Sequence, residues 1–220
     1  MWEVGNYGTI DYNALMVQLE KRMSHGFSAR ASYTLSRGRG NVDSGNNEII
    51  DTQVGDQLNL DRMEGPTSID RPHLFSLNGT WSVPRTSGLL LSGVVQARSG
   101  TPMTLIDSNT DLNRNGTFND EYLPAGTYSG TGENAFTVES EGGRRGVRGP
   151  NYFITNLRVG YRVPLGAQRA LDLFLDVFNL SNRANFENPT SDRRLTNFLI
   201  LRELEDGVTR TAQFNVRYTF

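Results

Sequence analysis

The chain contains no cysteine and only two histidines, His25 and His73, among its 220 residues. Without thiols it can form neither a disulfide framework nor a thiolate metal site, and two histidines are too few for a typical zinc cluster. No apolar run approaches the ~20 residues of a membrane-spanning helix. A formal net charge of −2 gives no reason to expect nucleic acid as a partner. These absences argue against an enzyme.

What the chain has in quantity is alternation of apolar and polar residues with a period of two. In "FSARASYTL", for example, Phe27, Ala29 and Ala31 alternate with Ser28 and Arg30. The same pattern recurs in "NALMVQLEKRM", "HLFSLNGTWSV", "LLLSGVVQAR", "FITNLRVGYRV", "ALDLFLDVFNL" and the terminal "TAQFNVRYTF". A period of two predicts strands with one apolar face. Several stretches reach about ten residues, the length of a tilted membrane strand.

The connections between these stretches alternate in length. "MSHG", "PRTSG" and "PLGAQ" are short and carry the Gly or Pro of a tight turn. The other links are long and polar, near residues 38–70, 107–150 and 185–207. Long structureless loops are uncommon in a compact soluble domain, whereas short turns alternating with long loops are typical of outer-membrane barrels. The sequence therefore predicts an all-β, antiparallel up-and-down meander of about seven strands in a bacterial outer membrane.

Seven strands would begin and end on opposite sides of the membrane, while bacterial barrels have an even number. We therefore expect residues 1–220 to be a partial, C-terminal segment of a larger outer-membrane β-barrel. The alternative is a secreted, soluble β-sandwich that acts as a binding module and carries a structural calcium loop.

Several stretches together resemble the barrels of TonB-dependent receptors of the Oar-like branch, which has a carboxypeptidase-regulatory-like N-terminal domain. They are "YNALMVQLEKRMSHGFSARASYTLSRGRGN", "DRPHLFSLNGTWSVP", "QARSGTPMTL" and "LDLFLDVFNLSNRANFENP", in the order of the family. The resemblance implies energised uptake of a nutrient through a 22-stranded barrel with a plug and a TonB box. Neither part is found here. The implied partners are outer-membrane lipid, the barrel-assembly machinery, an N-terminal barrel half with its plug and, through that part, TonB.

The resemblance also assigns a role to the last strand. Outer-membrane barrels of this kind end in an insertion signal, whose places are taken here by Gln213, Asn215, Tyr218 and Phe220. Asn215 stands where the family usually has Gly. A terminal aromatic suits the membrane interface.

The two sides of the alternation predict which residues face lipid and which face the lumen. Leu15, Val17, Leu91, Val95, Leu173 and Leu175 lie on the apolar side. The predicted lumen-facing residues are Arg30, Gln96, Arg98, Arg158, Arg162, Asp172 and Asp176. Asp172 and Asp176 would be ~13 Å apart along a strand, too far for the carboxylate pair of a glycosidase.

Two loop motifs carry charged or oxygen-bearing side chains. "DSNTDLNRNGTFND" spaces oxygen ligands as a calcium loop does, and the candidate ligands are Asp107, Asp111, Asn113, Asn115, Thr117 and Asn119. The pattern lacks the Glu expected at its twelfth position, so an Asn- and Asp-rich turn that binds nothing is the alternative. "GGRRGVRG" lacks the strand-to-helix context of a phosphate-binding loop, and we expect a flexible basic loop near the barrel rim.

Overall fold

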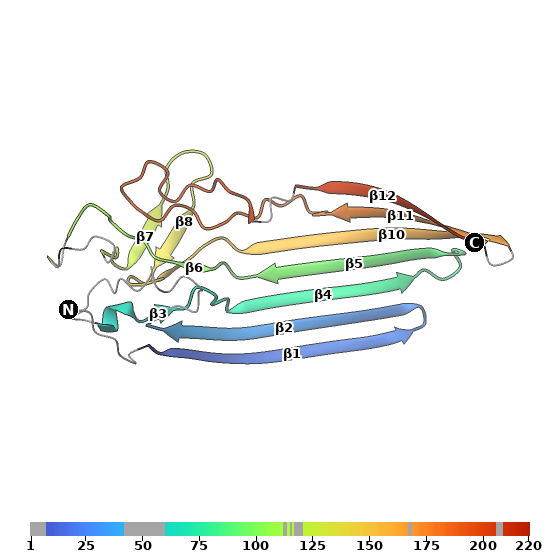
Figure 1. The fold of residues 1–220 in the computed structure, drawn as a ribbon, viewed down its shortest axis with the longest axis horizontal. Helices are drawn as coiled ribbons and strands as arrows, with labels where there is room; N and C mark the ends of the chain where they lie inside the picture. The colour runs from blue at the N-terminus through green and yellow to red at the C-terminus, as the bar shows by residue number, and fades with distance from the viewer. Residues whose placement is uncertain are drawn as a thin grey trace.

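Seven long strands lie side by side in one sheet of the computed structural model, which describes residues 8–41, 60–111, 114, 116, 121–166, 169–205 and 209–220 (Figure 1). They are β1 (Ile10–Ser24), β2 (Phe27–Gly40), β4 (His73–Ser82), β5 (Leu89–Arg98), β10 (Tyr152–Gly166), β11 (Arg169–Phe178) and β12 (Thr211–Thr219). Each pairs antiparallel with the next in the order β1-β2-β4-β5-β10-β11-β12. The predicted all-β, up-and-down meander is confirmed.

Short turns close one end of the sheet. His25 and Gly26 join β1 to β2 with φ angles of 53° and 77°, and a two-residue turn with both φ values positive matches the twist of paired strands. Residues 83–88 join β4 to β5, and β11 begins three residues after β10 ends. The long connections span residues 41–72, 99–151 and 179–210, and their described parts gather at the opposite end (Figure 1).

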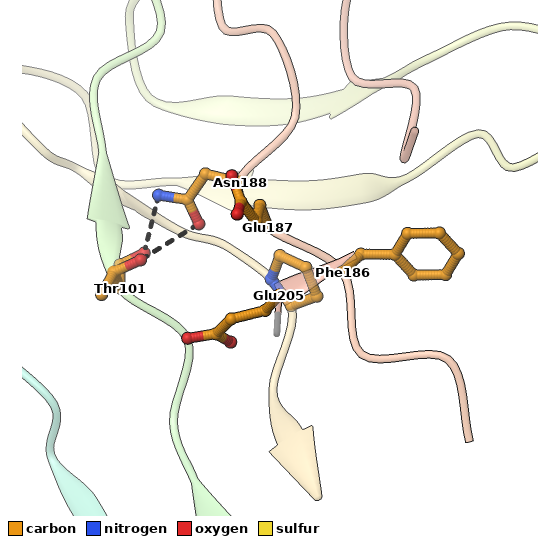
Figure 2. A pocket seen from close by; sticks show the side chains of 6 residues that line it. Thr101, Phe186, Glu187, Asn188 and Glu205 are labelled. Atoms are coloured by element: carbon orange, nitrogen blue, oxygen red, sulfur yellow. Dashed lines mark hydrogen bonds between the residues drawn. The ribbon is translucent and has the colours of Figure 1, made fainter. Parts of the chain in front are cut away.

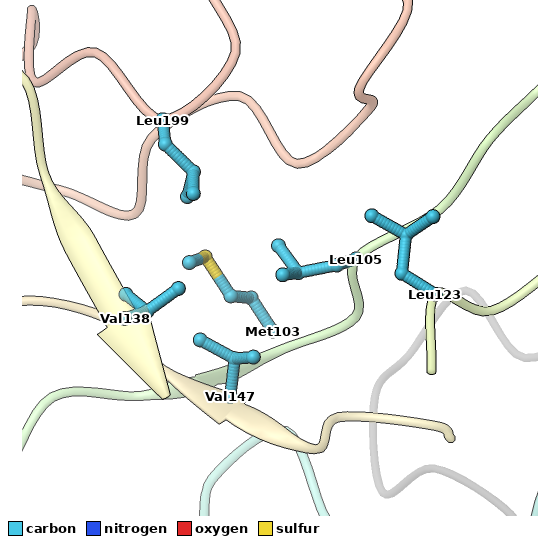
Figure 3. Close-up of a cluster of buried hydrophobic side chains, with 6 residues drawn as sticks. All are labelled: Met103, Leu105, Leu123, Val138, Val147 and Leu199. Carbon is cyan, nitrogen blue, oxygen red and sulfur yellow. The ribbon is translucent and has the colours of Figure 1, made fainter. Parts of the chain in front are cut away.

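The long connections build a folded body that we call the loop assembly: residues 60–72, 99–111, 121–151 and 179–205. Its short elements are the 3-10 helix η1 (Leu60–Met63), β3 (Gly65–Pro66), β6 (Pro102–Met103), β7 (Gly126–Ser129), β8 (Thr137–Ser140) and β9 (Val147–Arg148). β3 extends the sheet beside β2, while β6 pairs β9 and β7 pairs β8. The second and third connections share a hydrophobic core of Met103, Leu105, Leu123, Val138, Val147 and Leu199 (Figure 3).

The strand register separates the sheet into two faces, because directly paired residues point to the same side. One row across five strands reads Trp81, Leu91, Val159, Leu175, Phe214. The adjacent row reads Thr80, Ser92, Arg158, Asp176, Gln213. The six residues predicted to face lipid all fall on the side of the first row, which we call the apolar face. We call the opposite side the polar face.

No second layer covers the apolar face within the described residues. Leu15, Leu19 and Phe214 on this face are 61%, 69% and 65% exposed. A soluble sandwich would bury such side chains against a second sheet. None of the described residues forms a helix that is long and apolar enough to cross a bilayer.

Candidate functional site: the polar face and the loop assembly

The polar face gathers the seven residues predicted to line a lumen. The register places Arg30, Gln96, Arg98, Arg158, Arg162, Asp172 and Asp176 on this one side, spread over β2, β5, β10 and β11. Arg30 forms an ion pair with Glu20 on β1, at 3.0 Å. The strands therefore bring together side chains that lie more than a hundred positions apart in the sequence.

Arginines and carboxylates pair across β10, β11 and β12. Arg158 donates to both oxygens of Asp176, at 2.5 and 2.9 Å. Arg162 and Arg217 approach the two oxygens of Asp172 at 3.6 and 3.8 Å. The two carboxylates are buried while the three guanidinium groups stay exposed. Asp172 and Asp176 each face their own arginines and do not form an acid/base pair. Arg217 was not among the predicted lumen-facing residues, although it lies on the polar side of the last strand.

The polar face meets the loop assembly at Glu205. Its carboxylate accepts hydrogen bonds from Arg98 on β5, at 2.8 Å, and from Arg71 in the first long connection, at 3.2 Å. The Arg98 guanidinium also lies 3.9 Å from the centre of the Tyr152 ring. Nothing in the local sequence signals this junction, because Arg71 and Glu205 are 134 positions apart.

A cavity of about 310 Å³ opens beside this junction (Figure 2). It is lined by Thr101, Pro150, Phe186, Glu187, Asn188 and Glu205. In Figure 2 the Asn188 amide faces Thr101, whose hydroxyl donates to Asn188 Oδ1 at 3.2 Å, while the Phe186 ring points away from both. The cavity presents more hydrogen-bonding groups than apolar surface, so it suits a polar, hydrated ligand better than an apolar one.

Asp107, a predicted calcium ligand, is held by two arginines from the third connection. Asp107 is 2% exposed, and its carboxylate accepts hydrogen bonds from Arg193 and Arg194, both at 2.5 Å. Hydrogen bonds from Arg194 and then Arg193 lower the pKa of Asp107 from 3.8 to about 2, against the effect of burial. Asp192 lies beside this pair and accepts a short bond from the Ser108 hydroxyl. Asp107 therefore joins the second connection to the third.

The other predicted calcium ligands remain apart from this contact. The Asp111 carboxylate accepts the backbone N–H of Gly116, at 2.9 Å. Asn113, Asn115, Thr117 and Asn119 lie outside the described residues. In the part of the chain that the structure describes, no group of three or more His, Asp or Glu side chains is arranged to hold a metal ion. Calcium binding by this loop stays a prediction.

The basic loop "GGRRGVRG" is anchored, which corrects the expectation of flexibility. Arg144 donates to the carbonyl oxygens of Gly40 and Met63, at 3.1 and 2.9 Å. Arg148 pairs with Asp70, whose carboxylate also accepts the backbone N–H of Gly38 at 2.6 Å. Backbone carbonyls and Asp70 use the donors that a phosphate would need, and these bonds tie the second connection to the first.

The four residues assigned to the insertion signal divide between the faces. Gln213 and Asn215 lie on the polar face, where the Asn215 amide donates to Asp176 Oδ2 at 3.0 Å. This bond gives a physical reason for Asn in place of the usual Gly. Tyr218 lies on the apolar face, paired with Leu171, and its ring stacks with that of Phe220, with ring centres 6.0 Å apart. Their role in membrane insertion stays a prediction.

The apolar face has the height of a bilayer core. On β10 it runs from Phe153, in the row of Tyr33 and Phe75, to Val163, in the row of Tyr218. Ten residues rise ~34 Å along a strand, or ~26 Å when the strand tilts by ~40°, close to the ~25 Å apolar band of membrane barrels. Aromatic residues mark both ends of the band, as expected at the two interfaces.

Lys21 also lies on the apolar face within this band, and its side chain reaches toward the end of the strand. Its ammonium group donates to the Ser24 hydroxyl at 2.5 Å and lies 5.6 Å from the centre of the Phe27 ring. The two partners flank the short turn between β1 and β2, at the end of the sheet. A lysine on a lipid-facing surface reaches toward water in this way.

Comparison with known proteins agrees with this geometry. The model of the family described as "Outer membrane beta barrel domain" matches residues 1–213. Searches of the curated proteins and of the solved structures gave no significant match. The match covers nearly the whole chain, including all of the first six long strands. The chain belongs to the outer membrane beta barrel domain family, and its place is the bacterial outer membrane.

Proposed function

We propose that this chain is the C-terminal part of the barrel of a TonB-dependent receptor, which takes up a nutrient too large for porins. The observation that carries the proposal is the combination of an open sheet, a charged polar face and a folded loop assembly above it. The sequence resemblance to Oar-like barrels points the same way.

The edges of the sheet support a larger barrel. Within the described residues, β1 and β12 each pair on one side only. Unpaired backbone groups are costly in lipid, so membrane sheets close on themselves. Further strands between β12 and β1 would close the sheet around the polar face, which would then line a lumen. A barrel much larger than eight strands leaves an interior wide enough for a plug or a large solute.

The loop assembly supports a receptor more than a simple pore. Its core, the Asp107 contact and the Glu205 junction hold three connections in one arrangement above the polar face. A preorganised surface loses less conformational entropy on binding than mobile loops do. It is therefore suited to capture a cargo before the cargo enters the barrel.

The alternative, a soluble binding module, is not favoured. It would need a second layer over the apolar face, and the described strands form one sheet with that face exposed. The family match is also to a membrane barrel domain.

The uptake proposal can be tested without knowing the cargo. Three otherwise identical strains are grown in rich medium: the parent, a strain lacking this gene in full, and a strain lacking TonB. Mass spectrometry of the spent medium should show at least one solute that the parent removes and both deletion strains leave. A solute left only by the strain lacking this gene would mean passive diffusion and would contradict energised uptake.

A further inference from the structure

The polar face carries an excess of arginine over carboxylate, although the whole chain has a net charge of −2. Among the strand residues that the register assigns to this face, the arginines are Arg30, Arg98, Arg158, Arg162 and Arg217. The carboxylates are Glu20, Asp172 and Asp176. Five cations against three anions give this surface a positive field, and a confined surface of one sign concentrates solutes of the opposite sign.

The arginines occupy successive rows of the strand register, from one end of the polar face to the other. Arg98 pairs with Tyr152 in the register, Arg158 lies six residues further along β10, and Arg162 four residues beyond that. At ~3.4 Å per residue, the row of Arg98 lies ~20 Å from the row of Arg158, which lies ~14 Å from the row of Arg162. Arg30 lies between the first two, in the row of Asn156.

The last of these rows holds Arg162 and Arg217, and its guanidinium groups make different contacts from those of the other rows. Arg158 makes a two-bond contact with Asp176, and Arg98 donates to Glu205. Arg162 and Arg217 only approach Asp172, at 3.6 and 3.8 Å, and neither side chain donates a hydrogen bond within the described residues. Their side chains are 60% and 73% exposed, whereas that of Asp172 is 9% exposed. One buried carboxylate on β11 thus lies between two exposed arginines, one on each neighbouring strand, whose side-chain donors are unused within the described residues.

We infer that Arg162 and Arg217 form an anion-binding clamp on the polar face, and that the cargo of the barrel carries a carboxylate or phosphate group. Guanidinium groups bind both anions through paired N–H donors. Asp172 orients the two arginines and neutralises one of their two charges, so the clamp retains one net positive charge. That surplus is enough to hold an anion yet leaves it free to depart, as a transit site requires. The inference rests on the proposed uptake function, because it names the chemical class of the cargo.

Binding to the complete gene product in detergent at low salt tests the clamp directly. The probes are inorganic phosphate, citrate and, as an uncharged control, maltotriose. The double variant Arg162→Gln/Arg217→Gln is compared with Arg169→Gln, which removes an arginine from the opposite face of β11. We expect phosphate or citrate to bind the wild type and Arg169→Gln alike, and to bind the double variant at least about tenfold more weakly. Which of the two anions binds more tightly distinguishes a phosphate from a carboxylate cargo.

A second variant guards against loss of folding. Asp172→Asn removes the neutralising charge without removing the arginines, so it should tighten anion binding, and a change of opposite sign cannot come from misfolding. Heat-modifiable migration on gels checks that each variant is folded. Unchanged anion affinity in both variants would overturn the inference, as would tighter binding of maltotriose than of either anion. If no variant binds either anion, the clamp is occupied by an acidic segment of the receptor itself and the inference is wrong. None of these readouts involves TonB, so the uptake proposal stands or falls separately.

Discussion

The sheet and the loop assembly place their apolar side chains in opposite ways. On the sheet, Leu19 and Phe214 are exposed while Asp172 and Asp176 are buried. In the loop assembly, Leu105 and Leu199 are 2% and 0% exposed, and the arginines that hold Asp107 are half exposed. One chain thus contains a region built for lipid and a region built for water.

The difference shows what stabilises each region. The hydrophobic effect acts only on surface removed from water, so the sheet gains it from the bilayer and the loop assembly gains it from its own core. The sheet therefore depends on its membrane, while the loop assembly depends on contacts between connections that are distant in sequence. Changes to each region should have separable effects.

Truncation in the loop core should have the largest effect. Leu199→Ala should cost about 2–5 kcal/mol of loop-assembly stability, because it leaves a cavity among the six core side chains. Leu195→Ala, in the same connection but 50% exposed, is the matched control and should cost little. Hydrogen exchange of residues 121–151 and 179–205 measures both variants. Equal opening of the loops in the two variants would mean that the core does not hold them.

A charge on the apolar face should have a comparable or slightly smaller effect, confined to the membrane. Leu91→Arg should cost roughly 2–4 kcal/mol in vesicles, because Leu91 pairs with Val159 near the middle of the apolar band. Gln96→Arg, on the polar face of the same strand, should be tolerated. Urea unfolding of the complete gene product in phospholipid vesicles compares them, and similar losses at both positions would refute the assignment of faces.

The Asp107 contact should contribute less and should resist acid. Asp107→Asn should weaken the link between the second and third connections by about 1–3 kcal/mol, since it removes charged hydrogen bonds to two arginines. Glu133→Gln, an exposed carboxylate of the same assembly, is the control.

The pH dependence of this contact follows from its lowered pKa. Because the folded pKa of about 2 lies below the ordinary 3.8, the contribution is complete above pH ~4 and is lost as the pH falls through about 2. Pepsin cleavage of the loops should therefore be slow at pH 4 and faster at pH 2 in the wild type. Rapid cleavage of the wild type already at pH 4 would contradict this.

Calcium binding is the smallest expected effect. We propose that Asp111 and its Asn-rich neighbours bind calcium with a Kd of ~0.1–1 mM, since few ligands are charged. Asp107 contributes little, because both of its oxygens already serve arginines. Calorimetry at 10 mM calcium, with and without Asp111→Ala, measures it. The absence of any calcium-dependent heat would favour a turn that binds nothing.

The strands and their faces were predictable because both depend on local alternation. Any stretch such as "ALDLFLDVFNL" must separate Leu173 and Leu175 from Asp172 and Asp176 once it is extended, whatever its neighbours are. The polar-face pairs then follow from register, which the short turns fix.

The loop assembly was not predictable, because its contacts join residues that no local pattern relates. Leu199 enters a core built largely by the second connection, and Glu205 meets Arg71 across 134 positions. The spacing around Asp107 suggested a calcium ion, yet Arg193 and Arg194 supply the positive charge. Oxygen spacing alone does not distinguish these two sources. The same holds for the basic loop, whose arginines find carbonyl oxygens in the first connection.

The Glu205 junction has a consequence for how the sheet reaches its correct register. A slip of one residue between two strands turns apolar side chains to the wrong side, and the lipid itself rejects it. A slip of two residues keeps both faces intact, so lipid cannot detect it. Such a slip between β5 and β10 would shift Arg98 by ~7 Å relative to the connection that follows β10 and β11, and Glu205 would lose its partner. The contact between Arg98 and Glu205 thus disfavours a two-residue slip, a strand-pairing error that burial in lipid does not penalise.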